Sequence, residues 1–281
     1  MNKQIIQQIE KQLCCSITHQ EMVGGGCIAQ TSIIETNNGE SFFLKQGFKS
    51  SMFEKETNGL NELSKANVIR TPKIIATDEQ YLLLENIESG SKCIDFFEKF
   101  GKAFAQLHKH LSPHYGFYED NYIGSSQQIN SFKDSWQDFY FTNRLLYQYK
   151  LAESNGYSDS DFQKAFLNIE KQFPKIIEGS EERPCLLHGD LWAGNYMVDM
   201  NGEPVLIDPA VYYGHREADL AMTKLFGGFA PDFYNSYEDE YPLIEGYEYR
   251  ENIYLLYHIL NHLNIFGHSY KKQALQLMNS Y

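Results

Sequence analysis

Cysteine is scarce in this chain, and its pattern excludes two common stabilising devices. The 281 residues include five cysteines at irregular spacing, and Cys14 and Cys15 are neighbours, which makes them a poor disulfide pair. No two cysteines stand at the C-x-x-C spacing of structural zinc sites. We therefore expect reduced thiols in a cytoplasmic protein.

Basic residues are also fewer than acidic ones. The chain has 24 Lys and Arg against 37 Asp and Glu, which gives a net charge of −13, and it has no basic run. A protein that binds nucleic acid must neutralise many phosphates, so nucleic acid and anionic membrane surfaces are poor partners. A small anionic ligand needs only one local cationic pocket and remains compatible with this charge.

Long apolar runs are missing as well. No apolar stretch approaches 18 residues, and the amphipathic N-terminus lacks the apolar core of a signal peptide, so we expect no membrane span. The chain is instead rich in aromatic residues, with 20 Tyr and 19 Phe, and 42% of it is hydrophobic. This composition supports a substantial core, in one large domain or in two lobes.

The first ninety residues predict a small lobe rich in β-structure. Apolar spacing predicts helices over residues 1–14 and 50–65. Residues 16–45 indicate strands, with an Asn-Asn-Gly hairpin turn before the last of them. A further apolar strand covers residues 81–87.

The rest of the chain predicts mainly helices. Glu-Ser-Gly follows the last N-terminal strand and indicates a hinge at residues 85–90. The pattern then predicts helices over 96–111, 132–152, 159–178 and 251–267, and short strands over 185–188 and 204–208. The sequence therefore predicts an α+β fold with a small β-rich lobe, residues 1–88, and a larger helical lobe, residues 89–281.

One short stretch has the clearest chemical pattern. In LLHGDLWAGNYMV, residues 186–198, Asp190 precedes Asn195 by five positions, and Asp208 ends the next apolar strand. This is the Asp-to-Asn spacing of the catalytic loop H-R-D-x-x-x-x-N, whose carboxylate accepts the proton of an attacking hydroxyl. A second carboxylate and an amide supply the oxygen ligands that magnesium prefers. A hairpin with incidental turn residues is the simpler alternative, but it requires three independent coincidences.

A lysine and a glutamate upstream extend this pattern. Lys45 ends a predicted strand, and Phe53, Glu56 and Leu60 share one face of the helix that follows, with Glu54 on the opposite side. Glu56 should therefore face the core, where a carboxylate needs a partner, and Lys45 is the obvious one. In phosphoryl-transfer folds such a lysine contacts the ATP phosphates and is held by a helix glutamate.

A glycine-rich segment, Gly24 to Thr31, lies between two predicted strands upstream of Lys45. Glycine lets backbone amides approach phosphates, although three glycines also suit a flexible turn. The order of glycine-rich loop, strand lysine, helix glutamate, hinge, catalytic loop and metal aspartate is more specific than any single part. Cys27 in this segment is a candidate redox switch, with a small buried residue as the alternative.

This order of parts resembles the protein-kinase-like fold in its small-molecule branch, with His-Gly-Asp in place of His-Arg-Asp. The stretches HGDLWAGN, IDPAVYYGHREADLAMTKLFGGF and NYIGSSQQINSFKDSWQDFYFTNRLLYQ resemble signatures of the fructosamine (ketosamine) kinase family. GGGCIAQT, MFEKE and NHLNIFG are also similar to segments of that family. The resemblance covers nearly the whole chain and extends beyond the core shared with aminoglycoside and choline kinases.

The resemblance implies ATP- and Mg²⁺-dependent phosphorylation of ketosamines, the sugar adducts of glycated amines, at the third-carbon hydroxyl. The phosphorylated adduct is unstable, so the implied function is deglycation. It also implies a nucleotide-binding small lobe and a catalytic, substrate-binding large lobe. Asp190 would be the base, and Asn195 and Asp208 would hold magnesium. The implied ATP-binding residues are Gly24, Gly25, Gly26, Cys27, Lys45, Glu56, Glu85, Asn86 and Ile87.

Several residues near the catalytic loop are candidates for the acceptor side. Trp192 lies inside the loop and is expected to wall the sugar or the amine-bearing chain, with core packing as the alternative. His215 and Glu217 are candidate substrate contacts. Asp219 is expected to support the catalytic loop as an internal hydrogen-bond acceptor.

Two other functions stay open at this point. A different small-molecule kinase of the same fold, acting on an aminoglycoside or on an amino alcohol such as choline, would share the catalytic residues. A nucleotide-binding pseudoenzyme would share the fold alone, but the complete set Lys45, Asp190, Asn195 and Asp208 favours catalysis. The preferred sugar, a free or a protein-bound ketosamine as substrate, and a monomeric or dimeric state are all open.

Overall fold

The computed structural model describes residues 3–24, 29–47, 50–227 and 229–281. The chain divides into two compact units that do not follow chain order. Unit 1 comprises residues 1–96 and 194–208, and unit 2 comprises residues 97–193 and 209–281. Because residues 194–208 return to unit 1, this unit holds both predicted magnesium ligands as well as the lysine and the glutamate.

Unit 1 is built on one antiparallel sheet of strand order β1-β2-β3-β5-β4. The turn between β2 and β3 is the predicted Asn-Asn-Gly hairpin turn, and Gly39 adopts the left-handed φ of +84° that such a turn requires. The strands are β1 (Ile17–Val23), β2 (Gln30–Thr36), β3 (Ser41–Gln46), β4 (Ile74–Thr77) and β5 (Tyr81–Glu85).

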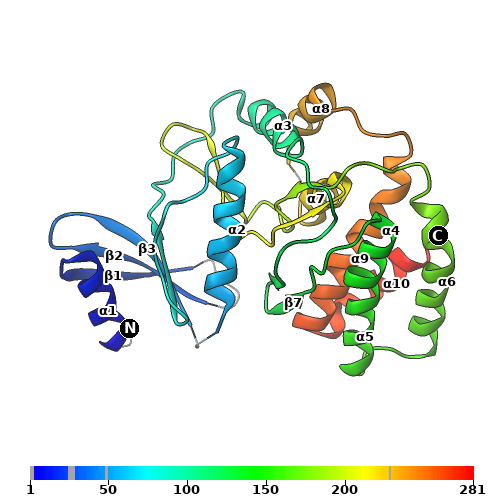
Figure 1. Cartoon of the computed structure of the whole chain (residues 1–281), viewed down its shortest axis with the longest axis horizontal. Helices are drawn as coiled ribbons and strands as arrows, with labels where there is room; N and C mark the ends of the chain where they lie inside the picture. Colours follow the sequence, from blue (N-terminus) through cyan, green and yellow to red (C-terminus); the bar gives the residue numbers. More distant parts are fainter. Residues whose placement is uncertain (1–2, 25–28, 48–49, 228) are drawn as a thin grey trace. The chain divides into compact units, whose positions relative to one another are not determined.

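Helices α1 (Lys3–Leu13) and α2 (Met52–Ala66) cover opposite faces of this sheet (Figure 1). Phe42 and Leu44 pack with α1, whereas Phe43 packs with α2. Since side chains alternate along a strand, Lys45 lies on the same face as Phe43, the face that α2 covers. The alternation in β3 thus directs the lysine toward the helix that carries Glu56.

A short antiparallel hairpin completes unit 1. It consists of β9 (Tyr196–Val198) and β10 (Pro204–Leu206). Arg70 joins it to the sheet, because the guanidinium donates to Asp199 at 2.8 Å and to Glu85 at 2.5 Å. This contact spans 129 residues of sequence between Arg70 and Asp199.

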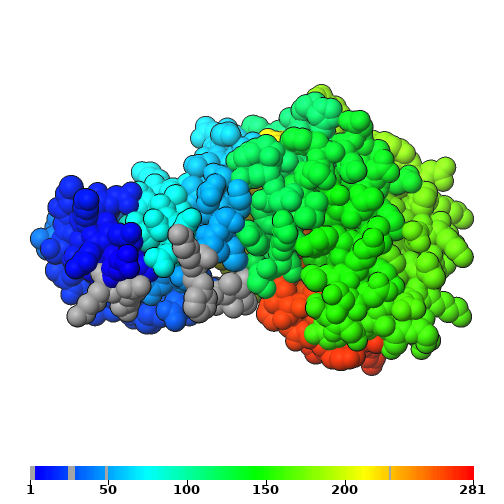
Figure 2. Space-filling view, turned by 60° about the horizontal axis from the view of Figure 1, so that its bottom comes forward, coloured from blue at the N-terminus to red at the C-terminus, as the bar shows by residue number. Residues whose placement is uncertain are grey.

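Unit 2 is mainly helical, and α9 (Tyr247–Phe266) lies at its centre. Helices α5, α7 and α10 all pack against α9 (Figure 1), and the orange-red atoms of the C-terminal helices lie against green atoms from much earlier in the chain (Figure 2). The other helices are α3 (Phe96–Leu107), α4 (Trp136–Tyr140), η1 (Phe141–Leu146), α5 (Tyr147–Ser154), α6 (Ser160–Ile176), α7 (Arg216–Leu225), α8 (Pro231–Glu240), η2 (His268–Tyr270) and α10 (Lys271–Met278). In the part of the chain that the structure describes, no helix is both long enough and apolar enough to cross a bilayer.

Two strand pairs brace the helices of unit 2. They are β8 (Cys185–Leu187) with β11 (Tyr212–Gly214), and β6 (Asn121–Ile123) with β7 (Ser126–Gln128). The predicted strands over 185–188 and 204–208 are both present. The first is β8, which pairs with β11 in unit 2, and the second is β10, which pairs with β9 in unit 1. The pairing of β8 with β11 brings the chain after Asp208 back beside the catalytic loop.

The predicted helix over 132–152 is interrupted by the π-helical segment η1. Arg144 lies in this segment, fully buried, and donates to the Ile129 carbonyl at 2.5 Å and to Asn130 Oδ1 at 2.7 Å. A buried guanidinium needs such acceptors. The wider helical turn therefore coincides with a tertiary contact that apolar spacing alone does not reveal.

Candidate active site

Lys45 lies at the centre of an ion cluster in unit 1. Its Nζ is 2.6 Å from Glu56 Oε1 and also donates to Asp208 Oδ1. Burial lowers the pKa of Lys45, but the two carboxylates outweigh it, so the pKa lies above its ordinary value. The expected pair of Lys45 and Glu56 is thus confirmed, and the lysine is a fixed positive charge.

Asn195 and Asp208 flank the β9–β10 hairpin. Tyr196 pairs with Leu206, and the Ile207 N–H donates to the Asn195 carbonyl at 3.1 Å, so the two predicted magnesium ligands lie at the same end of the hairpin. Asp208 has a φ of +53°, in the left-handed region that Asp tolerates better than most residues. The chain therefore turns sharply where the strand ends.

The donors of this hairpin end suit a hard cation. The Asn195 amide and the Asp208 carboxylate supply oxygen ligands, and 34% of the Asp208 side chain is exposed. Among the described residues, no three His, Cys, Asp or Glu side chains gather into a metal-binding group. Magnesium needs only one or two protein ligands when water and phosphates complete its shell, so the residues present fit it.

The predicted adenine-contacting segment begins with Glu85, the last residue of β5 in unit 1. The Glu85 carboxylate accepts from Arg70, the Asn86 amide donates to Ser41 Oγ at 3.1 Å, and Ile87 is buried. These side chains are thus engaged by the chain itself, and the Glu85 N–H also donates to the Lys73 carbonyl at 2.8 Å.

The glycine-rich loop is only partly described. Gly24 directly follows β1, and a Cβ there would meet no atom within 4 Å. Gly25, Gly26 and Cys27 lie outside the described residues, and the candidate redox switch lies there with them.

The turn of His188, Gly189 and Asp190 follows β8 in unit 2, and Asp219 of α7 holds it. The backbone N–H groups of His188 and Gly189 each donate to one Asp219 oxygen at 2.7 Å. A Cβ on Gly189 would lie 2.0 Å from the Ala210 carbonyl oxygen, and its φ is +83°, so only glycine fits. The expected role of Asp219 as internal acceptor is confirmed, and Asp190 itself is partly exposed.

Asp219 is itself in contact with His108, a residue that the sequence pattern did not indicate. His108 of α3 is fully buried, with Nε2 at 3.3 Å from Asp219 Oδ2 and Nδ1 at 2.7 Å from the Tyr237 hydroxyl. Burial lowers the pKa of His108 despite the Asp219 charge. The imidazole is therefore neutral at pH 7, donating to Asp219 and accepting from Tyr237.

The three candidate acceptor-side residues lie in different environments within unit 2. Trp192 is partly exposed. His215 is buried, with Nε2 at 2.6 Å from the Ser180 carbonyl, and Glu217 is buried in an ion pair with Arg250 at 2.6 and 2.8 Å. Of the three, only Trp192 presents a surface that a ligand can reach in this structure.

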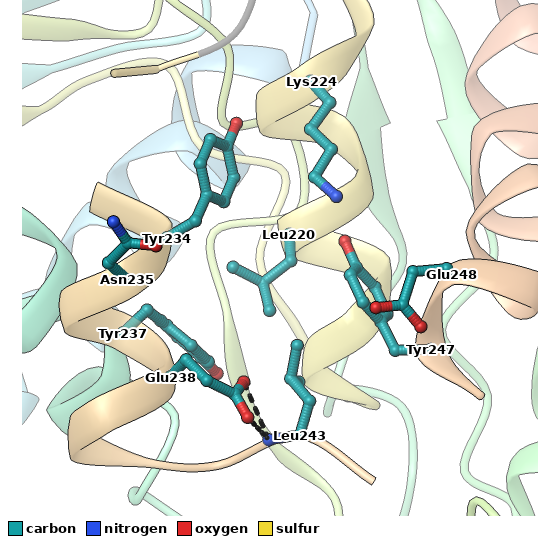
Figure 3. A pocket seen from close by; sticks show the side chains of 9 residues that line it. All are labelled: Leu220, Lys224, Tyr234, Asn235, Tyr237, Glu238, Leu243, Tyr247 and Glu248. Carbon is teal, nitrogen blue, oxygen red and sulfur yellow. Dashed lines mark hydrogen bonds between the residues drawn. The ribbon is translucent and has the colours of Figure 1, made fainter. Parts of the chain in front are cut away.

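A pocket of about 380 Å³ lies elsewhere in unit 2, among α7, α8 and the start of α9 (Figure 3). Lys224, Tyr234 and Tyr247 are among the residues that line it, and Glu238 accepts from the Leu243 N–H at its edge. None of the predicted catalytic, nucleotide or acceptor residues lines this pocket. It is therefore separate from the chemistry assigned to Asp190.

Solved structures share this fold. The structure superposes on a crystal structure described as a fructosamine-3-kinase from Thermobifida fusca with a TM-score of 0.89 and 25% identity. The match covers 98% of this chain and 97% of that chain. A choline kinase from Streptococcus pneumoniae matches over 100% of this chain and 99% of its own, with a TM-score of 0.67 and 16% identity. The predicted α+β, protein-kinase-like fold is confirmed.

Sequence comparisons are equally extensive. The chain is 41% identical to a protein named as a ketoamine kinase of Enterococcus faecium, over 92% of this chain and 94% of that one. It is also 41% identical to the chloroplastic protein-ribulosamine 3-kinase of Arabidopsis thaliana, over 94% of this chain and 83% of the relative. Residues 1–281 match the sequence profile of the fructosamine kinase family. The chain therefore belongs to the fructosamine kinase family of phosphotransferases.

Proposed function

We propose that this protein transfers the γ-phosphoryl group of ATP to the third-carbon hydroxyl of a ketosamine, and so starts the removal of the sugar from a glycated amine. The observation that carries the proposal is the buried Lys45, held between Glu56 and Asp208, in a chain of this family. The names of the relatives, ketoamine kinase and protein-ribulosamine 3-kinase, support the substrate class and the carbon that is phosphorylated.

In this proposal unit 1 supplies the phosphate-binding charges. Lys45 contacts the ATP phosphates, and Glu56 keeps the lysine oriented. Asn195 and Asp208 would hold Mg²⁺, which when bound neutralises charge on the phosphates. The backbone of Glu85, Asn86 and Ile87 contacts adenine, and the loop from Gly24 through Gly25, Gly26 and Cys27 covers the phosphates.

Unit 2 supplies the base and the acceptor surface. Asp190 accepts the proton of the acceptor hydroxyl as its oxygen forms a bond to the γ-phosphorus and the bond to the β-phosphate oxygen breaks, which releases ADP. Asp219 holds the backbone that carries this carboxylate. On the acceptor side the proposal rests on Trp192. The contacts predicted for His215 and Glu217 stay predictions, and the burial of both side chains does not support them.

The proposed setting is the cytoplasm, because Cys14, Cys15, Cys93 and Cys185 are thiols in the structure. The Arabidopsis relative, however, is named as chloroplastic.

The test is ADP release from Mg–ATP with a panel of acceptors: ribuloselysine, fructoselysine, choline and kanamycin. Turnover on the ketosamines alone is the expected result, and their relative kcat/KM values rank the sugars. Turnover on choline or kanamycin alone would overturn the substrate assignment while leaving the kinase fold and the base in place.

A further inference from the structure

An exposed cluster of aromatic rings adjoins the catalytic loop in unit 2. Trp192 meets Phe226 at a centroid distance of 5.7 Å, and Phe226 meets His262 at 5.0 Å. His262 also contacts the rings of Phe266 at 5.4 Å and Tyr270 at 5.2 Å. Phe226 and Phe266 are 40% and 49% exposed. Exposed apolar side chains that gather in this way often mark a binding surface.

The ring cluster is continuous with the proposed base. Trp192 follows Asp190 by two residues. Trp192 contacts Phe226, and Phe226 contacts His262, so the ring contacts lead from the loop of Asp190 to α9.

His262 presents one defined hydrogen-bond acceptor to this surface. Its Nδ1 lies 2.7 Å from the His258 carbonyl oxygen, which can only accept, so Nδ1 carries the proton. In the neutral ring Nε2 then carries a lone pair, and it has no hydrogen-bond partner among the residues that the structure describes. Burial lowers the pKa of His262, although the bond to His258 opposes this, so the ring is neutral at pH 7.

A ketosamine carries the chemical group that matches this acceptor. Its amine is an alkylamine, protonated near neutral pH, with N–H groups to donate. The nitrogen is attached to the first sugar carbon, two carbons from the hydroxyl that reacts. Ring faces attract such a cation, and a neutral imidazole does not repel it.

Resting on the proposed function, we propose that His262 Nε2 accepts a hydrogen bond from the protonated amine of the ketosamine, with Trp192 and Phe226 packed around that ammonium. His262 is then a substrate-binding residue that selects the amine adduct of a sugar over the sugar alone. A zinc site at His258 and His262 is the competing interpretation of two histidines four residues apart. It lacks the Glu of H-E-x-x-H and a third ligand among the described residues.

The experiment compares two acceptors that differ in one atom: fructoselysine, and its ether analogue with oxygen in place of the glycated nitrogen. The variants are His262→Phe, which keeps a ring and removes the lone pair, and His262→Gln, which restores an acceptor. Phe226→Leu removes a ring and provides a second, independent test. His268→Phe is the matched control, because His268 is exposed and contacts Tyr157 instead of the ring cluster.

The wild type should prefer the amine over the ether by about 10-fold or more in kcat/KM, as a charge-assisted hydrogen bond allows. His262→Phe should raise the KM for the amine by about 10-fold, leave the KM for the ether unchanged and so remove most of the preference. His262→Gln should recover part of it, and Phe226→Leu should lose part of it. His268→Phe should retain the full preference.

The outcomes separate this inference from the function on which it rests. If the wild type turns over fructoselysine and His262→Phe keeps the wild-type preference for the amine, the role of His262 is overturned and the kinase assignment stands. If the wild type phosphorylates no ketosamine, both are overturned together. A melting temperature for each variant shows whether a loss of activity reflects unfolding.

Discussion

The candidate residues of unit 1 are held by charge, whereas those of unit 2 are held by hydrogen bonds to the backbone and by a neutral histidine. In unit 1 Lys45 is fixed by two carboxylates, one of which is a third exposed. In unit 2 both oxygens of the buried Asp219 are committed to the His188–Gly189 backbone, and neutral His108 supports Asp219 from behind. The phosphates of a nucleotide can replace carboxylates as the partners of a lysine. A general base, in contrast, must be held in one fixed position.

The comparison predicts the largest effect for a change that forces the catalytic turn apart. Gly189→Ala places a Cβ 2.0 Å from the Ala210 carbonyl oxygen, on a backbone with φ of +83°. We expect a loss of roughly 3–5 kcal/mol in unfolding free energy and no measurable turnover. Chemical denaturation measures the first and ADP release the second.

Gly179→Ala is the control for this variant. Gly179 has a φ of +78°, but a Cβ there meets nothing within 4 Å. It should lose only about 1 kcal/mol, from backbone strain alone. Equal losses in the two variants would mean that the contact with Ala210 does not constrain the turn.

The next effect concerns the charges of unit 1. Lys45→Met leaves the Glu56 and Asp208 carboxylates facing each other without their cation. We expect the KM for ATP to rise by about 10-fold or more and the stability to fall by about 1–3 kcal/mol, limited by the exposure of Asp208. Lys55→Met on α2, the helix that carries Glu56, should change neither quantity. An unaltered KM for ATP in Lys45→Met would remove the lysine from the nucleotide site.

A change in unit 2 should separate acceptor chemistry from nucleotide binding. Asp219→Asn replaces one of two acceptor oxygens with a donor that faces a backbone N–H. Because this displaces the loop that carries Asp190, kcat should fall by about 10- to 100-fold while the Kd for ATP stays constant. Asp232→Asn on the surface of α8 is the matched control. Weaker ATP binding in Asp219→Asn would contradict the proposal that unit 1 binds ATP and unit 2 positions the base.

The smallest effect is a difference in acid sensitivity. Burial holds the pKa of His258 at about 3, against an ordinary value of 6.5. Below pH 6.5 this histidine binds a proton in the unfolded chain but not in the folded one. The free energy of unfolding should therefore fall by about 1.4 kcal/mol per pH unit between pH 6.5 and 3. Lys45, with its raised pKa, stays protonated throughout this acidic range and loses its proton only at strongly alkaline pH.

Melting temperatures at pH 7 and pH 5 measure this effect. His258→Leu should flatten the decrease, since the His258 Nδ1 has no hydrogen-bond partner to lose. His268→Leu, at an exposed position, should leave the decrease as it is in the wild type. Parallel decreases in all three proteins would show that His258 is not responsible.

Local sequence was sufficient for the parts of the site that follow a period. The alternation in β3 and the helical face of α2 placed Lys45 against Glu56, and the spacing in residues 186–198 is the basis on which Asp190 and Asn195 are predicted. The family resemblance supplied the rest of the expected roles. These features depend on residues close together in the chain, where a 2- or 3.6-residue period is informative.

The remaining contacts connect distant residues and leave no local signal. Lys45 and Asp208 are 163 residues apart, and His108 and Asp219 are 111 apart. The sequence predicts His215 and Glu217 as substrate contacts because they closely follow Asp208, the predicted metal ligand. In the structure their side chains turn inward to Ser180 and Arg250. Proximity along the chain does not show which way a side chain faces once β11 and α7 have formed.

The most direct test of the account is Asp190→Asn, assayed for ADP release with fructoselysine and for ATP binding by calorimetry. If Asp190 is the base on unit 2 and the nucleotide is held by unit 1, kcat should fall by about 10²- to 10⁴-fold and the Kd for ATP should stay within about twofold of the wild type. Near-normal turnover in the Asn variant would contradict the assignment of Asp190 as the base.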